Sequence, residues 1–278
     1  MKILVTGTAG FIGAALTQSL LDRGDYVLGI DDLNNYYDVN LKKARLEGLT
    51  SSASFLFKRL DISNRDHVSD LFSSNNFDVV VNLAAQAGVR YSIENPSTYV
   101  DTNLVGFGNI LEGCRYQEIN HLVYASSSSV YGSNTKLPFS ETDSVDSPIS
   151  LYAATKKANE LMAHAYSNLY QLPTTGLRFF TAYGPWGRPD MSLFRFVGNI
   201  LNNKPIQIFN NGNHSRDFTY IDDCVAGISK CFNYCIKNKK KYSIFNIASN
   251  RPIKLKYFIS VIEKKLQKVS KKKFLPLQ

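Results

Sequence analysis

The chain has 278 residues, of which 44% are hydrophobic and 20% are charged, and its formal net charge is +9 at pH 7. This length and composition are typical of a globular protein that can bury a sizeable core, and they exclude disordered and fibrous chains. No stretch approaches the roughly 20 apolar residues that cross a bilayer, and the amino terminus lacks a signal-peptide pattern. We therefore expect a cytoplasmic protein without a membrane partner.

The cysteines, histidines and basic residues indicate no metal site and no nucleic-acid partner. The four cysteines form no C-x-x-C pair, and the four histidines are scattered along the chain,. Basic residues gather near the carboxyl end, in "KNKKKY" and "VSKKKF". Since no motif of aromatic residues alternating with basic ones accompanies them, we interpret these runs as solvated surface.

The first elements along the chain are a strand, "KILVT", a glycine-rich turn and a helix. The turn carries the pattern G-x-x-G-x-x-G. A pyrophosphate needs close backbone N–H donors, and the amino end of a helix adds a favourable dipole, so side chains must be absent from such a turn. The residues that we expect to hold a dinucleotide here are Gly7, Gly10, Phe11, Ile12 and Gly13.

The second strand, "YVLGI", ends at Asp31. A carboxylate at this point can accept hydrogen bonds from both hydroxyls of the adenosine ribose, and it would repel a 2′-phosphate. The adjacent Asp32 adds to that repulsion. In the strand–helix–strand setting, this acid favours NAD over NADP as the cofactor.

Further strands alternate with helices, which predicts an α/β fold with a doubly wound parallel sheet, a Rossmann arrangement. Ligands bind such sheets at the carboxyl ends of the strands. The third strand, "ASFLFKRLDIS", is expected to meet the adenine edge, and the fourth, "FDVVVNLAAQAG", ends in small residues that let a cofactor pass. The later residues that we expect to contact the cofactor are Asp61, Ile62, Ala84, Ala85, Gln86 and Asn103.

The fifth strand, "HLVYASSSSVYG", ends in a run of serines, and a later helix carries Tyr152 and Lys156. The two residues are four apart, so they share one face of that helix. The phenol of tyrosine has an ordinary pKa of about 10, and a nearby ammonium lowers it so that the phenolate can act as a base. A serine hydroxyl at the strand end can then orient the proton path.

Together these motifs resemble the extended short-chain dehydrogenase/reductase family over almost the whole chain. The resemblance implies that Ser127 is the catalytic hydroxyl. It also implies that Tyr152 and Lys156 complete the catalytic set and contact the cofactor as well. Ser128 and Ser129 are then placed on the substrate side.

Other segments, including "AAQAGVRYSIENP" and "RFFTAYGPWGRPDM", are similar to the uronic-acid branch of that family, the UDP-glucuronate 4-epimerases. This similarity implies that bound NAD oxidises C4 of UDP-glucuronate for a moment and that hydride returns to the opposite face, giving UDP-galacturonate. It implies that Thr181 and Arg188 lie near the C6 carboxylate and that Arg90 supplies a further positive charge. Arg216 is implied as the clamp on the diphosphate.

Related functions stay open on the sequence. They are a UDP-glucose or UDP-N-acetylglucosamine 4-epimerase, a UDP-glucuronate decarboxylase and a truncated, inactive NAD-binding protein. The decarboxylase carries a glutamate where Ser129 stands, and a 4,6-dehydratase would carry an acid within the serine run.

The resemblance also implies how the chain is organised. We expect an NAD-binding domain over residues 1–177, to which segments near 217–248 return. We expect a smaller C-terminal substrate lobe over residues 178–278, incomplete at its carboxyl end relative to the family. A homodimer is expected by the same resemblance.

Overall fold

The computed structural model describes residues 1–238 and 240–276, and the chain divides into two compact units. The first unit comprises Met1–Phe180 and Ile221–Ile247. The second comprises Thr181–Tyr220 and the described residues from Ala248 onward. The chain therefore returns to the first unit once, for one helix and one strand.

A seven-stranded sheet forms the centre of the first unit, in the order β10-β6-β5-β4-β1-β2-β3. Every neighbouring pair is parallel. Its central strands are buried and largely apolar, such as "VVVN", as expected where helices cover both faces of a sheet,. The strands are β1 (Lys2–Thr6), β2 (Tyr26–Asp31), β3 (Phe55–Arg59), β4 (Val79–Asn82), β5 (His121–Ser127), β6 (Thr174–Phe179) and β10 (Tyr242–Ile247). The predicted α/β class and parallel sheet are confirmed.

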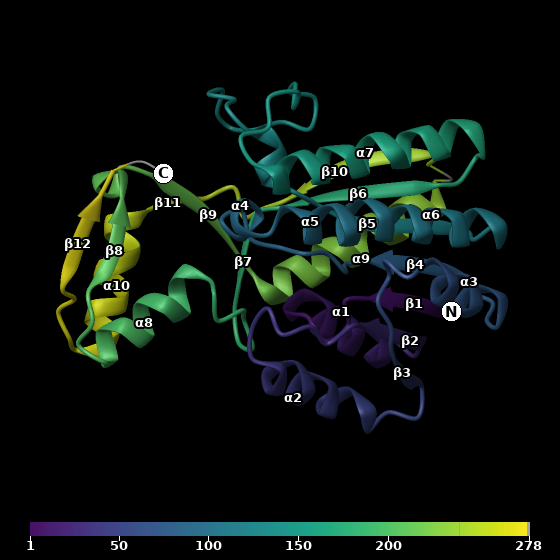
Figure 1. The fold of residues 1–278 in the computed structure, drawn as a ribbon, viewed down its shortest axis with the longest axis horizontal. Coiled ribbons are helices and arrows are strands. Elements are labelled where there is room, and N and C mark those ends of the chain that lie inside the picture. The colour runs from purple at the N-terminus through teal and green to yellow at the C-terminus, as the bar shows by residue number, and fades with distance from the viewer. Residues whose placement is uncertain (239, 277–278) are drawn as a thin grey trace. The chain divides into compact units, whose positions relative to one another are not determined.

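Helices flank this sheet (Figure 1). α1 packs against α9, and α6 packs against both α3 and α7. A π-helical segment, η1, leads directly into α6, and a short 3-10 turn, η2, follows β5. The helical segments are α1 (Phe11–Asp22), α2 (Val39–Thr50), α3 (Arg65–Ser73), α4 (Tyr91–Glu94), α5 (Pro96–Tyr99), η1 (Val100–Gly106), α6 (Phe107–Tyr116), η2 (Ser128–Tyr131), α7 (Leu151–Leu169) and α9 (Ile221–Lys237).

The main apolar core of the first unit lies between the sheet and the helices α3 and α6. Leu4 and Leu122 contribute to it from the strands, and Phe72, Phe107 and Ile110 contribute from the helices. All five side chains are at least 96% buried. This packing holds the strands rigidly, so the residues that follow their carboxyl ends start from defined positions.

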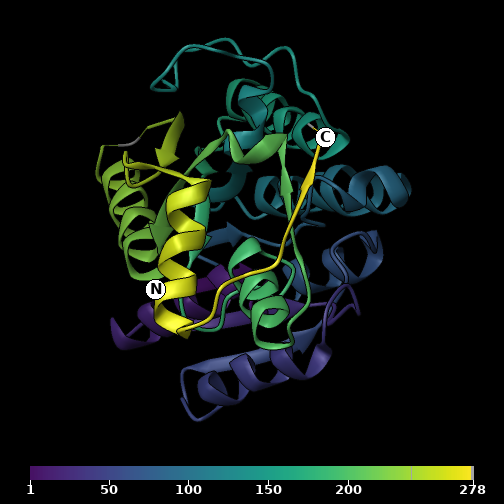
Figure 2. The same ribbon diagram turned by 90° about the vertical axis from the view of Figure 1, so that its left-hand side faces the viewer.

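The second unit has its own small core and two short sheets. β11, β9 and β7 form one sheet, and β12 pairs with β8 in the other. Figure 2 shows the helices α8 and α10 of this unit side by side, and Phe196 and Ile259 pack between them. The elements are β7 (Thr181–Tyr183), α8 (Ser192–Leu201), β8 (Ile206–Phe209), η3 (Asn210–Gly212), β9 (Ser215–Tyr220), β11 (Pro252–Lys254), α10 (Leu255–Leu266) and β12 (Lys272–Leu275).

Within the described residues, no helix is both long enough and apolar enough to cross a membrane. The same part of the chain contains no group of three or more His, Cys, Asp or Glu side chains arranged to hold a metal ion.

Candidate active site

The turn between β1 and α1 has room only for glycine at its critical positions. Gly7 has a φ of +72°, and a Cβ atom there would lie 2.8 Å from the backbone nitrogen of Ala84. A Cβ atom on Gly13 would lie 2.0 Å from the carbonyl oxygen of Gly7. The tight turn therefore brings backbone from β1, α1 and the segment after β4 together without intervening side chains.

The amino end of α1 offers backbone donors. Its first turn-spanning bond runs from the Ala14 amide to the Gly10 carbonyl, at 3.0 Å. The amides of Phe11, Ile12 and Gly13 precede that bond, so they are among the donors that a helix start leaves for a ligand. Together with the helix dipole, they fit a pyrophosphate.

Asp31 lies at the end of β2 and is 92% buried. Its carboxylate accepts hydrogen bonds from the amides of Ala9, at 3.2 Å, and Leu33, at 2.9 Å. Burial raises the pKa of Asp31, although the ammonium of Lys42, 3.8 Å away, and the two amides oppose this effect. A carboxylate offers about four acceptor positions. The positions left over can accept the two ribose hydroxyls of NAD, so the site fits that cofactor.

Two buried basic residues of α2 were not predicted from the sequence. The Lys42 side chain is 6% exposed beside Asp31, and the guanidinium of Arg45 donates to the carbonyl oxygen of Ala9 at 2.9 Å. Arg45 also donates to the Tyr37 hydroxyl at 2.7 Å. The run "NLKKARL" reads as an ordinary solvated helix, and only the tertiary contacts reveal that these two residues brace the glycine turn and Asp31.

The Asn103 side chain makes three hydrogen bonds within the protein. Its amide oxygen accepts from the Gln86 amide at 2.8 Å, and its nitrogen donates to the Gln86 carbonyl and to the Thr155 hydroxyl, each at 3.1 Å. Asn103 therefore ties the segment after β4 to α7, which carries Thr155. These three hydrogen bonds hold the Asn103 side chain beside the segment after β4.

The predicted cofactor residues after β3 and β4 differ in how exposed their side chains are. Asp61 is exposed and accepts from the Ser63 amide at 2.9 Å. The side chain of Ile62 is buried in the main core, next to Gly106, and its carbonyl oxygen accepts from the Asn109 side chain at 2.9 Å. Ala84 and Ala85 are half-buried after β4. The Ala84 amide donates to the Thr6 hydroxyl at 3.0 Å.

The π-helical segment η1 could not be anticipated from the sequence. Such segments are rare and often occur at functional sites. Just before it, the hydroxyl of Tyr99 donates to the carbonyl oxygens of Ala87, at 2.9 Å, and Gly88. The Tyr99 ring meets the Tyr152 ring edge-on, with centroids 6.1 Å apart. Tyr99 thus fixes both the loop after β4 and the orientation of the predicted base.

The helix α7 presents Tyr152 and Lys156 in its first two turns. The hydroxyl of Ser150 caps this helix by accepting from the Ala153 amide at 3.1 Å. Lys156 is 98% buried, and its ammonium donates to the carbonyl oxygen of Ala125 at 2.7 Å. Burial lowers the pKa of Lys156 to about 8. Lys156 therefore contacts β5 at Ala125, which lies two residues before Ser127.

The serine run divides into different tasks. The hydroxyl of Ser126 is buried and donates to the Glu160 carboxylate at 2.6 Å. The hydroxyl of Ser127 accepts from the Ser129 amide, at 3.2 Å, and from the Ser129 hydroxyl, at 2.9 Å. Ser127 thus caps the η2 turn and keeps its own proton available for a further acceptor. Ser128 and Ser129 are half-buried in that turn.

The remaining predicted substrate residues are distributed over the two units. Arg90 is exposed in the first unit, directly before α4. In the second unit, Thr181 and Arg188 line the same small cavity, and Arg188 forms a two-bond ion pair with Asp190, at 3.0 and 2.5 Å. Arg216 is exposed on β9.

The chain is similar in sequence to known epimerases and dehydratases. The sequence profile of the NAD dependent epimerase/dehydratase family matches residues 3–248. Protein CapI of Staphylococcus aureus is 53% identical over 100% of this chain and 87% of its own length. A probable UDP-glucuronate 4-epimerase of Rhizobium meliloti is 44% identical over 100% of this chain and 86% of its own length.

A solved structure agrees with the sequence relatives. The crystal structure of UDP-glucuronic acid 4-epimerase from Bacillus cereus, in complex with UDP-glucuronic acid and NAD, superposes with a TM-score of 0.88. The alignment covers 100% of this chain and 87% of that one, at 37% sequence identity.

Proposed function

This chain belongs to the NAD dependent epimerase/dehydratase family, and from that premise we propose that it interconverts UDP-glucuronate and UDP-galacturonate. The chain is an NAD-dependent nucleotide-sugar epimerase, and its cofactor is NAD. The choice of sugar rests on one observation above all. The relatives that match the whole chain at 37% identity or more include UDP-glucuronate 4-epimerases, one of them crystallised with UDP-glucuronic acid.

The cofactor roles that we propose follow the donors and acceptors of the first unit. The amides of Phe11, Ile12 and Gly13 would bind the pyrophosphate, and the Asp31 carboxylate would accept from the adenosine ribose. When bound, NAD would supply the hydride acceptor for C4 of the sugar and would give the same hydride back to the opposite face, so the reaction would involve no net oxidation. The other proposed cofactor contacts are Gly7, Gly10, Asp61, Ile62, Ala84, Ala85, Gln86, Asn103, Tyr152 and Lys156.

The proton chemistry is assigned to three side chains. Tyr152, as the phenolate, takes the proton of the 4-hydroxyl group when C4 is oxidised, and gives it back when the ketone is reduced. The Lys156 ammonium stabilises that phenolate by its charge. The Ser127 hydroxyl, whose proton is not needed within η2, donates to the oxygen on C4 and orients it.

The substrate roles are proposed as the resemblance implies them. Arg216 would bind the diphosphate, and Arg188, Thr181 and Arg90 would interact with the C6 carboxylate or gate it. Oxidation at C4 makes a β-keto acid, which loses CO₂ when the C5–C6 bond aligns with the carbonyl π system. We assign to Thr181, together with the hydroxyls of Ser128 and Ser129, the task of keeping the carboxylate out of that alignment.

Decarboxylation is less well supported than epimerisation. A decarboxylase of this family carries a carboxylate at the position of Ser129. Here, the Ser129 hydroxyl donates to Ser127 instead, so it supports the catalytic serine. We also propose a homodimer and a cytoplasmic location, both on the family resemblance.

The test is an incubation of the purified protein with UDP-glucuronate and no added cofactor, with the products separated by chromatography. A peak of UDP-galacturonate is the expected result, and it would show both epimerisation and retained NAD. A UDP-pentose peak would instead assign decarboxylation. If neither product forms, UDP-glucose and UDP-N-acetylglucosamine are tested next, and turnover of either would reassign the substrate.

A further inference from the structure

A buried ion pair lies behind the serine run, between α7 and β6. We propose that Glu160 and Arg178 are positioning residues for epimerisation. They hold Ser126, and through Ser126 they fix the end of β5 that carries Ser127. The identity of the reaction rests on the proposed function, whereas the positioning itself rests on the contacts below.

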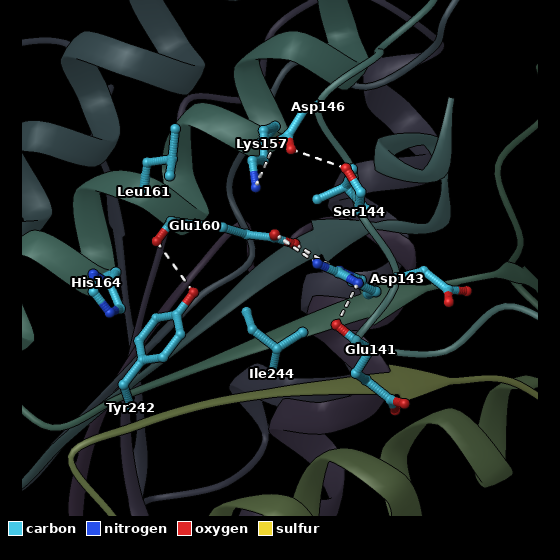
Figure 3. A pocket seen from close by; sticks show the side chains of 12 residues that line it. Glu141, Asp143, Ser144, Asp146, Lys157, Glu160, Leu161, His164, Tyr242 and Ile244 are labelled. Carbon is cyan, nitrogen blue, oxygen red and sulfur yellow. Dashed lines mark hydrogen bonds and ion pairs between the residues drawn. The ribbon is translucent and has the colours of Figure 1, made fainter. Parts of the chain in front are cut away.

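The pair is closed from solvent and fully engaged. The Arg178 and Glu160 side chains are 4% and 3% exposed. The guanidinium donates from Nε to Oε1 and from Nη2 to Oε2, each at 2.9 Å. Oε1 also accepts from the Ser126 hydroxyl at 2.6 Å. Figure 3 shows the Glu160 carboxylate with its two contacts to the guanidinium, at the wall of a pocket of the first unit.

Two consecutive turns of α7 are fastened to two consecutive residues of β5. Lys156 donates to the Ala125 carbonyl, and Glu160, one turn later, accepts from Ser126. A slide of the helix by one residue, about 1.5 Å, would break both bonds. The pair of contacts therefore sets the position of Tyr152, one turn before Lys156, relative to Ser127.

The guanidinium also holds the far side of the serine turn. Arg178 Nη1 donates to the Tyr131 hydroxyl at 3.1 Å, and that hydroxyl donates to the Asn246 side chain at 2.7 Å. Tyr131 ends the η2 turn that Ser127 caps. The ion pair thus contacts the residue before Ser127 and the last residue of the turn after it, so the catalytic serine is held from both sides.

The stability of the fold does not by itself require a charged pair at Glu160 and Arg178. Replacing a buried ion pair by apolar side chains of similar volume is often neutral or stabilising. What an apolar pair cannot do is accept the Ser126 hydroxyl and donate to Tyr131 at defined angles. The contacts to both ends of the serine turn are therefore the reason that we assign a positioning role.

The decisive variant is Ser126→Ala, which removes one hydroxyl and leaves the ion pair intact. Its matched control is Ser167→Ala on α7. The Ser167 side chain is equally buried, at 2% exposure, and its hydroxyl donates to the Leu172 carbonyl at 2.8 Å. We expect S126A to lower kcat about tenfold with KM changed less than about twofold, because a misplaced catalytic group costs rate more than binding. Equal kcat values for S126A and S167A would overturn the proposal.

A second measurement does not depend on turnover. Hydrogen exchange of the substrate-free protein reports the amides of residues 127–132, two of which are bonded within the turn. S126A and Glu160→Gln should speed their exchange, and S167A should not. Unchanged exchange in both variants would refute the positioning role. If the parent protein failed to convert UDP-glucuronate, this readout would still decide the question, since it involves no substrate.

The route through Ser126 is tested by combining changes. If Glu160 acts on catalysis through the Ser126 hydroxyl, the E160Q/S126A double variant should have a kcat close to that of the poorer single variant. Multiplied losses would show that Glu160 acts by another route, against the proposal.

Discussion

The ammonium of Lys156 donates a 2.7 Å hydrogen bond to the carbonyl oxygen of Ala125. This contact places a buried positive charge two residues before Ser127 and one helical turn after Tyr152. Burial lowers the pKa of Lys156 to about 8, so Lys156 loses its charge at a pH only slightly above neutral. Both activity and stability should therefore depend on whether Lys156 is protonated.

The first prediction concerns the alkaline limb of the pH–rate profile. Raising the pH through about 8 removes the proton of Lys156, and the neutral amine no longer stabilises the Tyr152 phenolate,. We expect kcat to fall as the pH rises above about 8, with a slope of one proton. Lys156→Arg should shift this fall to higher pH because a guanidinium stays charged. A profile that is flat to pH 10 in the parent protein would contradict the assignment.

The second prediction is that Lys156→Met gives an inactive but more stable protein. Burial lowers the pKa of Lys156 from 10.5 to about 8, so the buried charge costs the folded parent about 3 kcal/mol at neutral pH,. K156M removes this cost but loses the bond to Ala125, which is worth about 1 kcal/mol. In the parent, the unfolded chain binds the extra proton between pH 8 and 10.5, so stability from this group rises with pH across that window. K156M should lack that rise.

Thermal unfolding at pH 7 measures this effect, with an expected increase in Tm of about 2–6 °C. Lys157→Met is the matched control, because Lys157 neighbours Lys156 on the same helix but is only partly buried and faces Asp146 at 3.5 Å. A Tm of K156M below that of the parent would mean that Lys156 stabilises the fold.

The third prediction concerns the proposed base. Tyr152→Phe keeps the ring against Tyr99 and removes the hydroxyl, so turnover should fall about 10²–10⁴-fold, far more than the content of bound NAD,. Tyr166→Phe is the control on the same helix, since it loses a hydroxyl that donates to Glu112 at 2.5 Å, away from β5. Equal activities of the two variants would remove Tyr152 from the mechanism.

The fourth prediction concerns the choice between NAD and NADP. Asp31→Asn removes the charge that repels a 2′-phosphate, so the preference for NAD should shrink by about tenfold or more. The dissociation constants of both nucleotides, measured by fluorescence titration, give the ratio. Asp22→Asn, an exposed acid on α1 that accepts from Gln18, should leave the ratio unchanged. An unchanged ratio in D31N would exclude Asp31 from the discrimination.

The fifth prediction concerns fidelity. Thr181→Ala should raise the fraction of UDP-pentose among the products at least severalfold, because the carboxylate of the 4-keto sugar would be less restrained. Ser192→Ala is the control, since Ser192 lines the same cavity of the second unit as Thr181. If T181A formed no more UDP-pentose than the parent, restraint of the carboxylate would belong to other residues.

The class of fold, the nucleotide turn and the candidate chemistry could all be predicted from local patterns in the sequence. The glycine spacing, the acid that ends the second strand, and Tyr152 one helical turn from Lys156 are local patterns. They follow from backbone geometry over a few residues, so spacing alone predicts them. The alternation of apolar strands and helices predicted the parallel sheet for the same reason.

The contacts that hold these parts in place are visible only in the folded structure. Glu160 reaches Ser126 across 34 positions of sequence, and Tyr131 reaches Asn246 across 115. Asn103 is bonded to the Gln86 backbone, and the Ile62 side chain is buried in the core, and spacing along the chain predicts neither arrangement. Such contacts depend on the packing of elements that are distant in the chain, so the local sequence around each residue does not predict its partner.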